Sequence, residues 1–305
     1  MNRINHTIEE NIPEKLRLDR YISDYLHLFS RSQIKARELE GLINNKKVKF
    51  SRIIKKGDIL ELSWKNEETS LLMPEDINLK IIYEDDNVIV IDKPQGMVVH
   101  PGAGNWHGTL ANALYYIRLK KNKDNTGECI RPGIVHRLDK DTSGVMIAAY
   151  DDETHKFLSD QFKARKVKKT YYSIVKGKMN NNIGSIETLL TRDTKNRKKF
   201  MVSNRGKYSL THYKVIKTWN NYSFVLLRPK TGRTHQLRVH MRYIGNPIIG
   251  DSIYGVKDNY FYNETLMLHA KKLEITLPVD NKPRIFKTEL PERFKSLINK
   301  LDSYD

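Results

Sequence analysis

The chain has 305 residues, of which 39% are hydrophobic, enough for a normal globular core and about two domains. Its formal net charge of +18 favours a polyanionic partner, because each cation that neutralises a phosphate releases a counterion. The single cysteine, Cys129, excludes a disulfide framework and a cysteine-based zinc site, and no apolar run approaches the roughly 20 residues of a membrane span.

The first residues carry no recognisable targeting signal. Residues 1–15 lack the apolar segment of a signal peptide, and their acidic residues are not typical of a transit peptide. We therefore expect a cytoplasmic protein that does not associate with a membrane, and we expect residues 1–15 to be a flexible tail.

Residues 16–64 are predicted to form a small basic domain of helices and strands. Leu18, Ile22 and Leu26 recur at helical spacing, and Ser30 and Gln33 have the spacing of a capping box that opens a second helix running toward Gly41. Strands are predicted over 48–50 and 58–63. The cations concentrated here favour phosphate contact over a merely solvated surface; they are Arg17, Arg20, Arg31, Lys35, Arg37, Lys46, Lys47, Lys49 and Arg52.

Residues 65–80 are acidic and polar, contain Pro74, and are predicted to be a linker to a second domain over 81–305. The first strand of this second domain is expected at 88–91. It is followed over 92–102 by a loop whose conformation two Pro and two Gly would fix. Thr109 is predicted to be the N-cap of the amphipathic helix that follows.

The most unusual stretch is GIVHRLDKDTSGVMIAA, residues 133–149, where charged groups lie between two apolar runs. Either it is a turn shaped by Asp141, Thr142 and Gly144, or it is a catalytic loop held by a rigid scaffold. A helix is predicted over 153–163 and strands over 208–216 and 222–228. Adjacent Tyr171 and Tyr172 should face opposite sides of a strand.

A last helix is predicted to start near Thr234, with Arg233 immediately before its N-terminal end.

A metal site is weakly supported, since His235 and His240 are five residues apart and turn to different faces of a helix. A glycosidase-like pair of Asp139 and Asp141 is also weak, because the strand and not a bound sugar would set their separation. A non-catalytic RNA-binding protein would explain the charge but not the motifs.

Four motifs carry a resemblance to a known family. HRLDKDTSG (136–144), KPQGMVVHP (93–101), KTY (169–171) and GRTHQLRVH (232–240) are similar to the motifs of RluA-type pseudouridine synthases, in the same order. Residues 30–60 also resemble a small RNA-binding domain shared with a small-subunit ribosomal protein. That domain usually has a glycine near Asn45, and here Asn44 and Asn45 would have to take the turn conformation.

The resemblance implies an α+β fold: a small N-terminal helix-plus-strand RNA-binding domain, then a mixed, mostly antiparallel β-sheet catalytic domain flanked by helices. It implies an isomerase that converts specific uridines in structured RNA to pseudouridine. We expect large-subunit ribosomal RNA as the substrate, with transfer RNA as the alternative. No metal and no small-molecule cofactor are expected, and the protein is expected to be a monomer.

The resemblance also assigns roles to individual residues. Asp139 would be the catalytic carboxylate, acting as a nucleophile or as a base. Arg233 would pair with Asp139 and keep it ionised. Arg137 would enter the space vacated by the target nucleotide, Tyr171 would pack against the target base, and Leu237 would line the uracil pocket.

Overall fold

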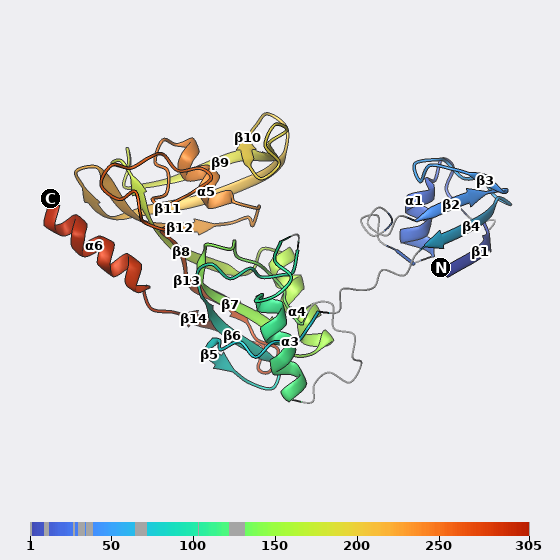
Figure 1. Ribbon diagram of the computed structural model, residues 1–305, viewed down its shortest axis with the longest axis horizontal. Coiled ribbons are helices and arrows are strands. Elements are labelled where there is room, and N and C mark those ends of the chain that lie inside the picture. Colours follow the sequence, from blue (N-terminus) through green and yellow to red (C-terminus); the bar gives the residue numbers. More distant parts are fainter. Residues whose placement is uncertain are drawn as a thin grey trace. The chain divides into compact units, whose positions relative to one another are not determined.

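The computed structural model describes residues 2–8, 12–26, 28–29, 34, 39–64, 72–102, 104–121 and 132–304. The chain divides into two compact units, residues 1–71 and residues 72–305, drawn in Figure 1. In the described part of the chain, no helix is long and apolar enough to cross a membrane.

The first unit contains a four-stranded sheet in the order β1-β4-β2-β3. Its strands are β1 (Asn2–Thr7), β2 (Glu40–Ile43), β3 (Lys46–Lys47) and β4 (Ile59–Trp64). The predicted flexible tail is wrong for residues 2–7, because β1 pairs with β4 from Asn2 opposite Trp64 to Thr7 opposite Ile59. This strand satisfies the backbone groups along one edge of β4, and Ile4 and Ile8 pack into the core.

A short helix, α1 (Leu18–Arg20), continues as a π-helical segment, η1 (Tyr21–Tyr25), and buries Leu18 and Ile22 as their spacing predicted. The predicted second helix falls largely outside the described residues. The strand expected over 48–50 is absent there, since β3 ends at Lys47. Asn44 and Asn45 adopt φ values of 52° and 63°, so they supply the turn that a glycine would otherwise make.

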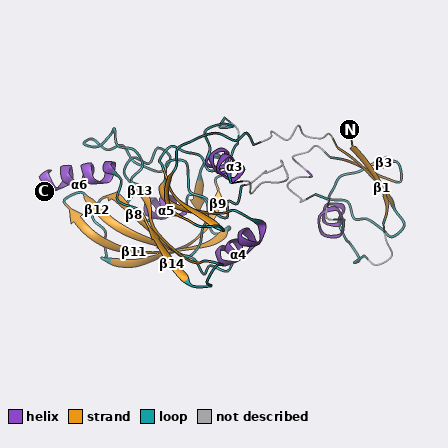
Figure 2. Ribbon diagram, turned by 90° about the horizontal axis from the view of Figure 1, so that it is seen from below, coloured by secondary structure: helices purple, strands orange, loops and turns teal. Residues whose placement is uncertain are grey.

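The second unit is built on one ten-stranded sheet in the order β10-β9-β11-β12-β8-β13-β7-β6-β5, with β14 paired to β13. Among its described strands the β13–β7 pair is parallel and the other pairs are antiparallel, so the expectation of a mixed, mostly antiparallel sheet is confirmed. Figure 2 shows neighbouring strands of this sheet, among them β11 and β12. The strands are β5 (Lys80–Glu84), β6 (Val88–Lys93), β7 (Ser143–Ala149), β8 (Lys168–Lys176), β9 (Ile183–Arg192), β10 (Phe200–Val202), β11 (Lys207–Trp219), β12 (Tyr222–Pro229), β13 (Leu268–Thr276) and β14 (Pro283–Lys287).

In the part of this unit that the structure describes, four helices flank the sheet: α3 (Leu110–Lys120), α4 (Asp152–Lys163), α5 (Gln236–Tyr243) and α6 (Glu292–Tyr304). Figure 1 shows α3 and α4 beside the part of the sheet that contains β6 and β7, and α5 beside β9 and β11. Thr109 caps α3 as predicted, with the Asn112 N–H donating to its hydroxyl at 3.3 Å. The segment after Leu72 packs on the same helix, since the Asn112 amide donates to the Met73 carbonyl at 2.8 Å. The second unit therefore begins at Leu72, within the segment predicted to be a linker.

The middle of the sheet determines where the functional loop lies. β13 pairs with β7 at Ala270 opposite Gly144, and with β8 at Ala270 opposite Tyr171. Gly144 has a φ of +120°, and a Cβ there would lie 2.3 Å from the Ala270 carbonyl oxygen. Only glycine allows this approach to β13, and the loop before β7 is therefore separated from β8 by this one strand.

Candidate active site

A cavity of about 500 Å³ opens in the second unit where the loop before β7, strand β8 and the segment between β12 and α5 meet. All five residues singled out from the sequence line it: Arg137, Asp139, Tyr171, Arg233 and Leu237. These residues are far apart in the chain. Their segments meet because β8 pairs with β12 on one side and with β13 on the other, and β13 also pairs with β7.

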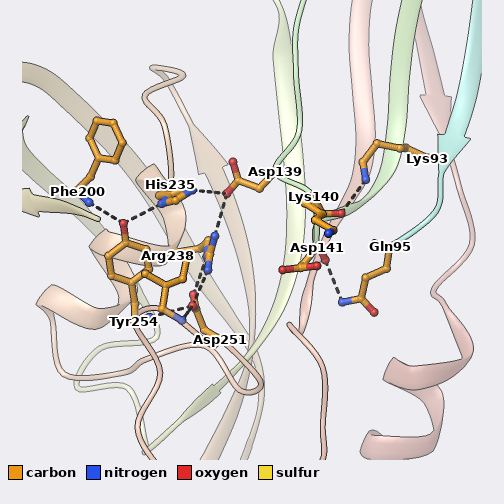
Figure 3. A network of polar contacts seen from close by, with 11 residues as sticks. Lys93, Gln95, Asp139, Lys140, Asp141, Phe200, His235, Arg238, Asp251 and Tyr254 are labelled. Carbon is orange, nitrogen blue, oxygen red and sulfur yellow. Dashed lines mark hydrogen bonds and ion pairs between the residues drawn. The ribbon is translucent and has the colours of Figure 1, made fainter. Parts of the chain in front are cut away.

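The backbone around Asp139 is fixed by a turn and by a buried lysine. The Thr142 N–H donates to the Asp139 carbonyl at 3.1 Å. Lys93, which is fully buried, donates to the carbonyl of Lys140 at 3.1 Å (Figure 3). It also donates to the carbonyls of Pro94 and Met97 at 2.8 Å. Burial lowers the pKa of Lys93 to about 8, against the attraction of nearby carboxylates. The loop over 92–102 thus anchors the turn that follows Asp139.

The side chain of Asp139 faces a buried arginine on α5. Arg238 Nη1 lies 3.4 Å from Asp139 Oδ2, and the same guanidinium binds Asp251 with Nε at 2.7 Å and Nη2 at 2.6 Å (Figure 3). Burial works against the charged form of Arg238, but the hydrogen bonds and charge of Asp251 prevail and raise its pKa. Asp139 therefore lies beside a permanent, rigidly held cation.

The expected pairing of Arg233 with Asp139 is wrong in this structure, because Arg233 Nε donates to the Tyr208 carbonyl at 3.0 Å. Arg233 precedes α5, which begins only at Gln236, whereas Arg238 lies within that helix and is buried. Both arginines belong to the GRTHQLRVH motif, and spacing alone does not distinguish them. Sequence reasoning overlooked Arg238, the second arginine of this motif, as a partner for Asp139. Arg233 still lines the cavity.

The two adjacent tyrosines of β8 separate as the alternation of a strand predicts. Tyr171 lines the cavity, and burial, with a smaller effect of the Asp139 charge, raises the pKa of its hydroxyl. Tyr172 packs edge-on against Phe224, with ring centroids 5.2 Å apart. Leu237 is buried in the core and also reaches the cavity. The cavity thus offers an aromatic and an apolar surface close to a carboxylate.

His136, the first residue of the central motif, has a structural place. Its ring stacks on Phe162 with centroids 4.5 Å apart, and its Nε2 accepts the Ile147 N–H at 3.1 Å. Burial, followed by the charge of Lys169, lowers the pKa of His136 to about 3, so the ring is neutral. It supports the loop that carries Arg137 and Asp139.

The two histidines considered as metal ligands turn apart, as their spacing predicted. His235 Nε2 lies 3.9 Å from Asp139 Oδ2, whereas His240 is buried among the hydroxyls of Thr188, Ser209 and Thr211. No group of three metal-ligating His, Cys, Asp or Glu side chains occurs among the described residues. Sequence reasoning did not identify His235, Asp251 or Tyr254 as neighbours of the carboxylate.

Comparisons with known proteins agree on one family. The sequence profile described as RNA pseudouridylate synthase matches residues 87–243. The chain is 48% identical over 296 residues to the ribosomal large subunit pseudouridine synthase D of Borreliella burgdorferi, covering 94% of this chain and 89% of that protein. It is 41% identical over 303 residues to an uncharacterized RNA pseudouridine synthase of Aquifex aeolicus, covering 95% of each.

A solved structure extends the likeness to the fold. Human RNA pseudouridylate synthase domain containing 1 superposes with a TM-score of 0.57 at 25% sequence identity. The match covers 75% of this chain and 96% of the human one.

Proposed function

Because this chain belongs to the RNA pseudouridylate synthase family, we propose that it converts specific uridines of large-subunit ribosomal RNA into pseudouridine, with Asp139 as the catalytic carboxylate. The ribosomal substrate is supported by the name of the Borreliella burgdorferi relative. The observation that carries the site assignment is the position of Asp139 in a cavity, 3.4 Å from the buried Arg238.

The reaction rearranges one nucleotide without net loss of atoms. The bond between uracil N1 and ribose C1′ breaks, the uracil turns, and a bond from C5 to C1′ forms. C5 gives up its hydrogen as a proton, and N1 gains one. An ionised Asp139 acts in this sequence either as nucleophile or as base. Arg238 places a positive charge 3.4 Å from this carboxylate.

The cavity walls suit a flipped-out base. Tyr171 provides an aromatic surface and Leu237 an apolar one, and both line the same space as Asp139. A base in a stem must be extruded at a cost of a few kcal/mol. Arg137 is exposed at the rim and can occupy the vacated space. Lys163, Arg165 and Lys230 also line the opening and can contact the flanking phosphates.

The test is conversion of RNA by the purified protein. Large-subunit ribosomal RNA and transfer RNA, both transcribed without modification, are incubated separately with the protein, and pseudouridines are located by carbodiimide labelling and reverse transcription. We expect discrete new sites in the ribosomal RNA. Sites confined to transfer RNA would support the alternative substrate, and binding without any new site would contradict the proposed activity.

The first unit is proposed to add RNA affinity without taking part in chemistry. Removing residues 1–71 should weaken binding to ribosomal RNA and flatten its salt dependence by about one unit of slope for each phosphate that the protein no longer neutralises. Slow conversion of the correct uridine should remain at saturating enzyme, since every residue assigned to the site lies after Leu72. A folded truncated protein, checked by circular dichroism, that converts no uridine in a short target stem-loop would contradict this division.

A further inference from the structure

The proposed chemistry leaves one neighbour of Asp139 without a role. His235 precedes α5 and adopts a left-handed backbone conformation, with φ 55° and ψ 15°. Its ring lies between two groups: Nε2 is 3.9 Å from Asp139 Oδ2, and Nδ1 is 2.8 Å from the Tyr254 hydroxyl (Figure 3). The ring therefore connects the carboxylate to a second tyrosine.

The hydrogen bonds of Tyr254 indicate where the imidazole proton lies. The Phe200 N–H donates to the Tyr254 oxygen at 2.8 Å, which leaves the hydroxyl proton available for His235 Nδ1. A neutral imidazole that accepts at Nδ1 carries its proton on Nε2. Burial lowers the pKa of His235, against the raising effect of Asp139, so the neutral ring is favoured. Its Nε2–H then points toward Asp139.

The surroundings hold this arrangement in place. The rings of His235 and Tyr254 meet edge to face with centroids 5.6 Å apart, and Phe200 packs edge-on against His235 at 5.8 Å. The Arg238 guanidinium lies over the Tyr254 ring, 5.2 Å from its centroid. Tyr254 is itself buried. Neither ring can turn without disturbing its neighbours.

We propose that His235 is a positioning residue for Asp139: Tyr254 holds the neutral ring with its proton on Nε2, and this N–H is a second donor to the carboxylate beside Arg238. The inference rests on the proposed function, in which Asp139 carries the chemistry. At 3.9 Å the contact is longer than a hydrogen bond. The proposal requires this contact to shorten when a uridine fills the cavity, as catalytic hydrogen bonds often do on substrate binding.

This arrangement makes conversion sensitive to acid. The charged groups facing His235 are Asp139, Arg238, Asp251 and Arg137. Protonating the ring would displace the Tyr254 proton from Nδ1 and place a cation against Asp139, reducing the basicity of the carboxylate. In the proposed arrangement Tyr254 donates to Nδ1, and only the neutral ring can accept this hydrogen bond. Removing that hydroxyl should therefore move the acid limb of the rate profile to higher pH.

Three single variants and one double variant test the proposal through the single-turnover rate on a short target RNA at saturating enzyme. His235→Asn keeps a polar atom near the Nδ1 position but loses the Nε2 donor, and should slow conversion by about tenfold to 100-fold with RNA affinity roughly intact. His235→Gln places an amide near the Nε2 position and should recover much of that loss. Tyr254→Phe keeps the ring packing and should shift the acid limb upward, whereas adding Tyr254→Phe to His235→Asn should cause no further shift.

The tautomer is tested separately in the wild-type protein by long-range ¹H–¹⁵N correlation of the histidine rings. We expect the protonated nitrogen of His235 to be Nε2 and the unprotonated one Nδ1. A proton on Nδ1, a wild-type rate in folded His235→Asn, or a Tyr254→Phe profile that superimposes on the wild-type profile would overturn the proposal. Should His235→Asn fail to fold, the Tyr254→Phe profile and the spectrum decide. Absence of any conversion by the wild-type protein would instead count against the proposed function.

Discussion

Asp139→Asn is expected to abolish pseudouridine formation, lowering the single-turnover rate by at least about 10³-fold, while RNA affinity stays roughly intact. The substitution keeps the size of the side chain but removes the charge that serves as nucleophile or base. Asp139 is only 19% exposed, yet it is not part of the apolar core, so the fold should survive. The rate is followed as release of the C5 hydrogen from uridine tritiated at that position.

The matched control is Asp141→Asn, two residues further along the same loop. Asp141 contributes its main-chain carbonyl, which accepts from the Gln95 amide at 2.9 Å, and it does not line the cavity. This variant should retain most of the activity. Equal loss of activity in both variants, or substantial release of the C5 hydrogen by Asp139→Asn, would show that the chemistry is not assigned to the right carboxylate.

Arg238→Ala should have the largest effect on stability, about 3–5 kcal/mol in the free energy of unfolding, because it leaves a buried carboxylate without its counter-charge. The side chain of Asp251 is completely buried and holds Arg238 through two charge-assisted hydrogen bonds. The change is measured by urea unfolding. A loss of less than about 1 kcal/mol would mean that Asp251 is stabilised by other groups.

A double variant separates the structural role of Arg238 from its role beside Asp139. Arg238→Gln combined with Asp251→Asn removes both buried charges and should regain part of the stability. It should not regain the rate of conversion, because Asp139 still lacks the neighbouring cation. Full activity in the stable double variant would contradict the electrostatic role of Arg238.

The ion pair between Arg238 and Asp251 also makes the stability of the wild-type protein depend on pH in the acid range. Burial alone would raise the pKa of Asp251, but the hydrogen bonds and charge of Arg238 outweigh it and lower this pKa below its ordinary value. The folded pKa is thus below the unfolded one. The stability that the pair contributes is present above the ordinary aspartate pKa of about 4 and is lost as the pH falls through the lowered value.

Local patterns predicted much of the second unit. Thr109 caps its helix, β6 begins at the predicted Val88, and the alternation along β8 sends Tyr171 to the cavity and Tyr172 to the core. These features depend on neighbours in sequence. The strand at residues 2–7 was missed because its mostly polar residues carry no strand signal, and its pairing with β4 decides its conformation.

The partner of Asp139 was missed for a related reason. Whether Arg233 or Arg238 faces the carboxylate depends on where α5 begins, and His235 delays that start by adopting a left-handed conformation. The assignment also depends on Asp251, which lies beyond the helix and holds Arg238 in place. Such long-range contacts have no signature in the spacing of a single motif.

The most direct test of the role of Asp139 is a site-by-site map of pseudouridine in RNA from cells whose own copy of this protein is either wild type or Asp139→Asn. We predict that one or a few pseudouridines in large-subunit ribosomal RNA disappear in the Asn variant, with transfer RNA and small-subunit ribosomal RNA unchanged. Identical maps from the two cell lines, with the variant protein present at normal levels, would contradict the claim that Asp139 carries the chemistry of this enzyme.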